Sequence, residues 1–145
     1  MINEAIIQKR DEFQQWLFDM DNALEEFINI FKKDENINLD FSPNSLDKVE
    51  KWILNNFDSK EDLLKSKNKY LLNMIAVYIG ETFRKNIGGK WKLDIDNEKS
   101  AYFNLPILTD SPKINSPVAP HTLATACISR EKGNYISTIL NNKLN

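Results

Sequence analysis

The sequence predicts a single helix-rich α+β domain with a long central helix and a small antiparallel sheet. The central helix is predicted from residues 63–91, which are apolar on nearly every side between Tyr70 and Ile79, as in a buried helix. Elsewhere apolar residues recur at helical spacing, and short stretches alternate with a period of two. At 145 residues the chain has the length of one domain. Because no repeat or flexible linker divides it, residues 1–145 are treated as one domain.

Residues 2–31 are predicted to form one long amphipathic helix. Asp19, Asp21 and Asn22 are weak helix formers near its middle, where the helix could bend or split. Its apolar face suits packing within the domain, and a homodimer through this helix is the alternative. The positions on that face advance in steps of seven, four and three: Ile6, Phe13, Leu17, Met20, Leu24, Phe27 and Phe31.

The next segment combines a predicted strand with two helix starts. Residues 37–41 alternate between apolar and polar, which predicts a short strand with one buried face. A helix is expected over 43–57, because Ser42 can cap it and Pro43 suits the first helical position. Ser59 and Asp62 resemble a second capping pair, which places the start of the central helix near Lys60.

The central helix is expected to end at Gly88-Gly89, since glycine readily adopts the left-handed conformation found after many helices. Alternation over 91–95 and again over 102–108 predicts a hairpin at about 90–108. Pro106 lacks a backbone donor, so the second strand should be an edge there or end early. Two short helices are expected on either side of Gly133-Asn134.

Composition and charge argue against several classes of protein, namely nucleic-acid-binding, membrane-spanning and secreted proteins. The 19 Lys and Arg residues against 21 Asp and Glu leave a net charge of −2, which argues against nucleic acid as a partner. The longest apolar run, 74–79, is far too short to cross a bilayer, and the N-terminus lacks the apolar segment of a secretory signal. With Cys127 as the only cysteine, no intrachain disulfide can form. We therefore expect a cytoplasmic protein with no membrane association.

Metal and cofactor sites are not predicted. With His121 as the only histidine and Cys127 as the only cysteine, a His- or Cys-rich zinc site cannot be built within one chain. The two residues would lie about 240° apart around a helix, which disfavours a Cys–His nucleophile pair. We expect Cys127 to be a small buried residue and His121 to cap a helix or lie at the surface. The glycines do not form a phosphate-binding loop, so no cofactor is expected.

Two groups of residues are candidates for binding. Glu81 and Arg84 stand three positions apart on the central helix, where they should form a charge pair at the edge of the core. The pair could be structural and orient Trp91 and the hairpin, or it could line a small pocket with Tyr78.

The second group is the acidic run Asp94, Asp96 and Glu98. It resembles part of a calcium loop but lacks the glycine and the distal glutamate of that loop, so a solvated strand face is favoured. No residue in either group is assigned a catalytic or metal-binding role.

Two segments, LDFSPNSLDKVEKWI (39–53) and YIGETFRKNIGGKW (78–91), resemble a loose group of small bacterial cytoplasmic proteins. The strong match covers about a fifth of the chain. Members of that group generally have no assigned activity, and they often look like immunity or accessory proteins of bacterial toxin systems. The matching residues are Asp40, Ser42, Pro43, Ser45 and Leu46 in the first segment and Tyr78, Gly80, Glu81, Arg84, Gly88, Gly89 and Trp91 in the second.

The preferred hypothesis is a non-enzymatic protein-binding module, most concretely an immunity protein that neutralises a bacterial toxin encoded nearby. The acidic run Asp94, Asp96 and Glu98 would then contact a basic toxin, because complementary charge speeds association. The alternative is a small-molecule binder or an enzyme that uses the Glu81 carboxylate in a cleft between the central helix and the hairpin.

Overall fold

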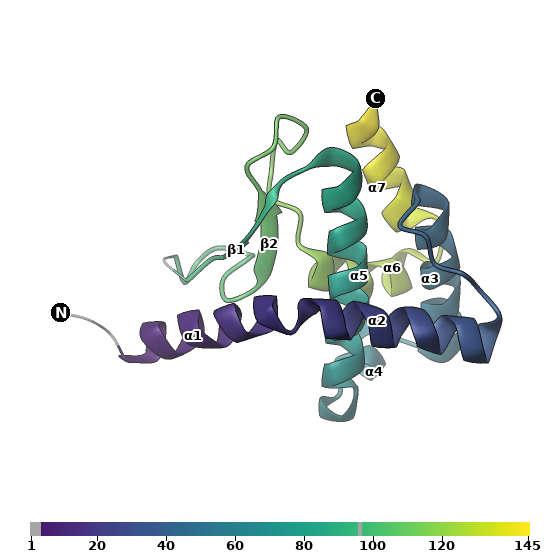
Figure 1. The fold of residues 1–145 in the computed structure, drawn as a ribbon, viewed down its shortest axis with the longest axis horizontal. Helices are drawn as coiled ribbons and strands as arrows, with labels where there is room; N and C mark the ends of the chain where they lie inside the picture. Colours follow the sequence, from purple (N-terminus) through teal and green to yellow (C-terminus); the bar gives the residue numbers. More distant parts are fainter. Residues whose placement is uncertain (1–3, 96) are drawn as a thin grey trace.

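Helix α5 (Lys69–Ile87) runs through the middle of the fold, and most of the other helices pack around it (Figure 1). The computed structural model describes residues 4–95 and 97–145. The arrangement confirms the predicted α+β class. The remaining elements are α1 (Glu4–Phe18), α2 (Met20–Ile30), a π-helical turn (Phe31–Glu35), α3 (Pro43–Asn56), α4 (Lys60–Leu63), a 3₁₀ turn (Ser66–Asn68), β1 (Lys90–Leu93), β2 (Pro106–Thr109), α6 (Pro120–Arg130) and α7 (Tyr135–Leu144).

The core is built on the second half of α5. Every residue from Met74 to Phe83 is buried, because α5 contacts α2, α3, α6 and α7 and is therefore covered on all sides. The predicted core began at Tyr70, which is wrong: Tyr70 is 58% exposed. Its hydroxyl instead donates a hydrogen bond to Glu26 on α2 at 2.5 Å.

The central helix starts nine residues later than predicted, at Lys69 instead of Lys60. The Ser59 hydroxyl does accept from the backbone N–H of Asp62 at 3.1 Å, but this cap belongs to the short helix α4. Asn68 then donates its side-chain N–H to the carbonyl of Asp62 at 2.8 Å. Because that carbonyl at the end of α4 is satisfied from outside the helix, the chain can turn before α5 begins.

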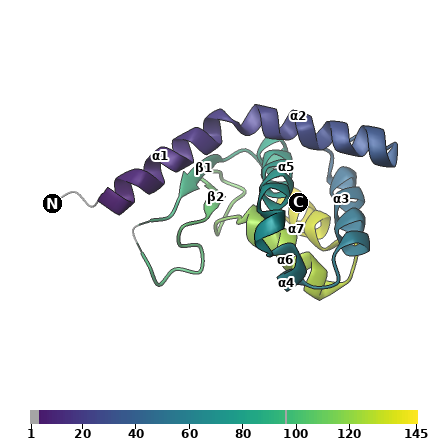
Figure 2. The ribbon, with the colours of Figure 1, turned by 90° about the horizontal axis from the view of Figure 1, so that it is seen from below.

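The predicted N-terminal helix is two helices, with a bend at Asp19 (Figure 2). Helical hydrogen bonds continue across the bend, from Asp19 N–H to the carbonyl of Gln15 at 2.9 Å and from Ala23 N–H to that of Asp19 at 3.1 Å. The two halves differ in burial. Helix α2 buries four residues against the core, whereas α1 has no buried residue.

The predicted strand at 37–41 is wrong, since these residues form an extended loop and the sheet contains β1 and β2. Phe41 has a positive φ of 62°, which no strand residue adopts. Its backbone N–H donates to the Tyr78 hydroxyl at 3.0 Å, and its carbonyl accepts from the Asn86 side chain at 3.0 Å. Side chains of α5 thus occupy the groups that a neighbouring strand would have used.

The predicted hairpin is present, with a shorter second strand. Strands β1 and β2 pair antiparallel, with Trp91 opposite Leu108 and Leu93 opposite Pro106. Because Pro106 stands at the first position of β2, its missing N–H leaves the ladder intact. Leu108 also forms a single antiparallel bridge with Val118, which holds the connection to α6 against the sheet.

The remaining helix boundaries agree with the prediction. Ser42 caps α3 by accepting from the N–H of Ser45 at 3.1 Å, and Gly88 ends α5 with φ at 81°. The two C-terminal helices α6 and α7 lie on either side of Gly133. Among the described residues, no helix combines the length and the apolar character needed to cross a bilayer.

Candidate functional site

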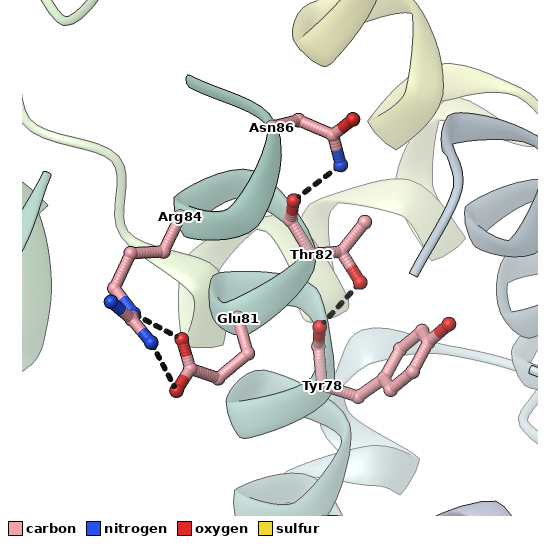
Figure 3. Close-up of polar contacts among 5 residues, drawn as sticks. All are labelled: Tyr78, Glu81, Thr82, Arg84 and Asn86. Carbon is pink, nitrogen blue, oxygen red and sulfur yellow. Dashed lines mark hydrogen bonds and ion pairs between the residues drawn. The ribbon is translucent and has the colours of Figure 1, made fainter. Parts of the chain in front are cut away.

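Glu81 and Arg84 form the predicted charge pair, on one side of α5 (Figure 3). Arg84 donates from Nε to Glu81 Oε2 at 2.5 Å and from Nη2 to Oε1 at 3.3 Å, so the contact is bidentate. The hydrogen bond to Glu81 raises the pKa of Arg84 above its usual value. Glu81 is only 5% exposed, and both of its carboxylate oxygens accept from Arg84.

Tyr78 does not join this pair, because its side chain points away from Glu81 and Arg84 (Figure 3). Its hydroxyl forms a 2.7 Å hydrogen bond with Ser45 Oγ and accepts from the N–H of Phe41. Burial raises the pKa of the Tyr78 hydroxyl. Residues 39–53 and 78–91 therefore meet at Tyr78, in a contact that joins α3 and its preceding loop to α5.

Trp91 lies against Gly80, on the face of α5 that also receives α6. A Cβ atom at Gly80 would overlap the six-membered ring of Trp91 and would lie 3.1 Å from Pro120 Cγ, so the glycine is needed for this close approach. Trp91 meets Trp16 of α1 edge to face, with ring centroids 4.9 Å apart. The buried Nε1 of Trp91 has no hydrogen-bond partner among the described residues.

The acidic run after β1 is only partly described. Asp94 is half-buried and its carbonyl accepts from the N–H of Asn104, Glu98 is exposed, and Asp96 lies outside the described residues. Within residues 4–95 and 97–145, no group of three or more His, Cys, Asp or Glu side chains could hold a metal ion.

Cys127 is fully buried, as predicted, and burial raises the pKa of its thiol to about 12. The thiol donates to the carbonyl of Ala124 at 3.1 Å within α6. A thiol that stays protonated and covered cannot serve as a nucleophile at neutral pH.

His121 does not cap α6, whose N-cap is Ala119, so that expectation is wrong. The residue is partly exposed, its ring lies 6.4 Å from the ring of Trp16, and its Nδ1 is buried without a hydrogen-bond partner among the described residues. Burial lowers the pKa of His121 to about 4, so the ring is neutral at pH 7. Trp16 in turn donates from Nε1 to Asn73 Oδ1 at 2.5 Å. Helices α1, α5 and α6 thus meet at three aromatic or polar side chains far apart in the sequence.

A surface hollow of about 650 Å³ opens beside these residues. A smaller hollow of about 280 Å³ adjoins it, sharing Trp16, Lys69, Asn73 and His121 and extending to the hairpin at Leu93 and Pro106. The sequence signals were slight: a tryptophan on the apolar face of α1 and the only histidine in the chain. The larger hollow is lined by Trp16, Ser66, Lys67, Lys69, Tyr70, Leu72, Asn73 and His121.

A second feature that the sequence reasoning missed is an acidic ridge on the outward side of α1 and α2. Between residues 11 and 31 there is no Lys, Arg or His. Phe18 stands within this stretch and is 81% exposed. We use the name acidic ridge for Phe18 together with the exposed carboxylates Asp11, Glu12, Asp19, Asp21, Glu25 and Glu26.

No protein-family model, curated protein or solved structure shows significant similarity to this chain.

Proposed function

We propose that this protein is a non-enzymatic protein-binding module, and that the acidic ridge is the surface that binds its partner. The single observation that carries the proposal is the ridge itself, in which six exposed carboxylates and an exposed Phe18 occur without a cationic residue between positions 11 and 31. A basic protein surface is the complementary partner.

Helical spacing places the ridge residues on one stripe. Asp11, Phe18 and Glu25 follow one another at intervals of seven, and the remaining four carboxylates flank this line. The hydrogen bonds across the bend at Asp19 keep the two helices in register. The opposite side of α2 carries its buried residues, so the stripe faces outward from the core.

The exposed side chain of Phe18 could be buried by a binding partner. Aromatic residues, phenylalanine included, are enriched in the cores of protein interfaces, where a few residues carry most of the binding energy. Two copies of the ridge would repel each other, so a basic partner is a better occupant of this face than a second copy of the chain.

The surroundings of the candidate carboxylate support a non-enzymatic function. Glu81 is bound at both oxygens by Arg84, and Tyr78 faces another part of the core, which leaves Glu81 without the access that an acid or base needs. Taken with the family resemblance, this supports a cytoplasmic immunity protein whose target is a basic toxin encoded nearby.

The direct test is co-expression with the product of the neighbouring gene, followed by purification and measurement of the binding kinetics. In the double variant Asp11→Lys/Glu25→Lys we expect the association rate to fall by roughly tenfold or more, with a weaker salt dependence. In Phe18→Ala we expect the dissociation constant to rise by roughly 30-fold.

The matched control is Asp58→Lys/Glu61→Lys, which makes the same charge change at two exposed carboxylates outside the ridge and outside the acidic run 94–98. It should bind nearly as the unmodified protein does. Equal losses in both double variants would show that net charge, and not the ridge, controls binding. If the product of the neighbouring gene does not bind this protein at all, the proposal is contradicted.

A further inference from the structure

The hollow beside Trp16 has the size and the walls of a small-molecule site. Its volume of about 650 Å³ lies within the range of 300–1,000 Å³ that is typical of ligand pockets. Trp16 and Tyr70 contribute aromatic surface and Leu72 an aliphatic one. The hollow and the acidic ridge share no lining residue, but they border each other, because the ridge residue Glu26 accepts a hydrogen bond from Tyr70.

Two polar side chains, His121 and Asn73, belong to the wall of this apolar space. Nδ1 of His121 is covered and has no hydrogen bond among the described residues, so it is not a contact for a ligand. Asn73 accepts from Trp16 through Oδ1, so its amide N–H groups remain available as donors. A ligand with one polar acceptor near its ring would bond to Asn73.

The charge at the hollow is positive. Lys67 and Lys69 line it, no carboxylate does, and neither lysine forms an ion pair with a carboxylate of the described residues. Carboxylates do lie close by, since Glu26 accepts from Tyr70 and Glu12 lines the adjoining smaller hollow. The two lysines attract a negatively charged ligand, and the nearby carboxylates would repel a polyanion. A ligand with a single negative charge is therefore favoured.

We propose that this hollow binds a small aromatic carboxylate. The ring would lie against Trp16 and Tyr70, the carboxylate would pair with Lys67 and Lys69, and a polar acceptor on the ligand would bond to the Asn73 amide. This inference goes beyond the proposed protein-binding function and does not depend on it, because no residue of the ridge lines the hollow.

The test uses the full chain labelled with ¹⁵N, titrated with indole-3-acetate and followed by the indole N–H signals of its three tryptophans. We expect the Trp16 signal to shift and saturate, because its Nε1–H bonds to Asn73 at the hollow. Trp52 packs between Phe31 and Phe57 on another side of the core, so its signal is an internal control that should not move.

Two comparison ligands separate the ring from the charge. Indole has the ring without the carboxylate, and acetate has the carboxylate without the ring. Indole-3-acetate should bind at least tenfold more tightly than either. Equal affinity for indole-3-acetate and indole would overturn the assignment of Lys67 and Lys69, and a Trp16 signal that does not move at millimolar ligand would overturn the site.

Variants make the assignment residue-specific. Lys67→Met/Lys69→Met should weaken indole-3-acetate binding by roughly tenfold and leave indole unaffected. The matched control Lys32→Met/Lys48→Met removes two exposed lysines elsewhere and should change neither. All four lysines are exposed, so the variants should fold normally, and identical losses in both pairs would contradict the proposal.

Discussion

Glu50 and His121 each have a buried titratable group near a helix N-terminus, and their surroundings differ. Glu50 of α3 is fully buried, and its two carboxylate oxygens accept from the backbone N–H groups of Tyr135 at 3.0 Å and Ile136 at 2.9 Å. These are donors at the start of α7 that have no partner within that helix. His121, at the start of α6, has a buried Nδ1 without a partner and a hollow beside it.

The difference lies in the hydrogen bonds. The carboxylate of Glu50 is bonded inside the protein, whereas Nδ1 of His121 has no partner among the described residues. Around Glu50 every polar requirement is met inside the protein, and the nearby Ser137 hydroxyl also donates to Asp47 at 2.5 Å. Nδ1 of His121, by contrast, is covered beside the hollow without such a partner among the described residues. The Glu81–Arg84 pair resembles Glu50, since it is satisfied internally. A buried charge is thus informative about function only once its partners are known.

The largest expected effect is at Glu50. In Glu50→Ala the two N–H donors of α7 lose their acceptors, at roughly 1–3 kcal/mol each, so the free energy of unfolding should fall by about 4 kcal/mol in urea titrations. The exposed ridge residue Glu25, changed to Ala, should cost less than about 0.5 kcal/mol. If Glu50→Ala lowered the free energy of unfolding by less than about 1 kcal/mol, the hydrogen bonds of Glu50 to α7 would not stabilise the fold as proposed.

A smaller effect is expected at His121, and it should depend on pH. The pKa of His121 is about 4 in the folded protein and about 6.5 in the unfolded chain, so below pH 6.5 the unfolded state takes up the proton first. Stability should therefore be at its full value above pH 6.5 and fall by up to about 3 kcal/mol between pH 6.5 and 4.

The check is the urea midpoint measured from pH 7.5 to 4, with His121→Phe as the comparison. That variant removes the titrating group and should flatten the profile in this window. Asp40 and Asp62, whose pKa values lie below the usual value through hydrogen bonds with Ser42 and Lys65, contribute only at lower pH. An unchanged slope in His121→Phe would assign the acid sensitivity to other groups.

The smallest effect is expected at the Glu81–Arg84 pair. Arg84→Met leaves the nearly buried carboxylate unpaired and should cost about 1–2 kcal/mol, with the value limited because Arg84 itself is exposed. The double variant Glu81→Gln/Arg84→Met should cost less than Arg84→Met alone. A double variant that cost the sum of the two single changes would show that the two side chains are not coupled.

Local sequence signals predicted much of the fold because their causes are local. The Ser42 cap, the Gly88 helix end and the joint at Gly133 each depend on a few adjacent residues, and all are found where expected. The Glu81–Arg84 pair was also predictable, since three positions on a helix bring two side chains together.

The errors arose where distant residues decide the outcome. Residues 37–41 have the alternation of a strand, but the hydroxyl of Tyr78 and the amide of Asn86 bind the backbone of Phe41 and exclude a ladder. Likewise, the sequence predicts that the central helix starts near Lys60. In the structure the side chain of Asn68 donates to the carbonyl of Asp62, and the chain turns there before α5 begins. Periodicity carries no information about such contacts.

By itself, the sequence determined the fold class, most helix ends and the charge pair on α5, because helix and turn propensities act over a few residues. Only the tertiary structure decided that Trp16, Asn73 and His121 meet beside a hollow, and that Glu50 caps α7. The physical reason is that burial and hydrogen-bond satisfaction depend on which distant segments pack together, and α1, α5 and α6 come together only once the core has formed.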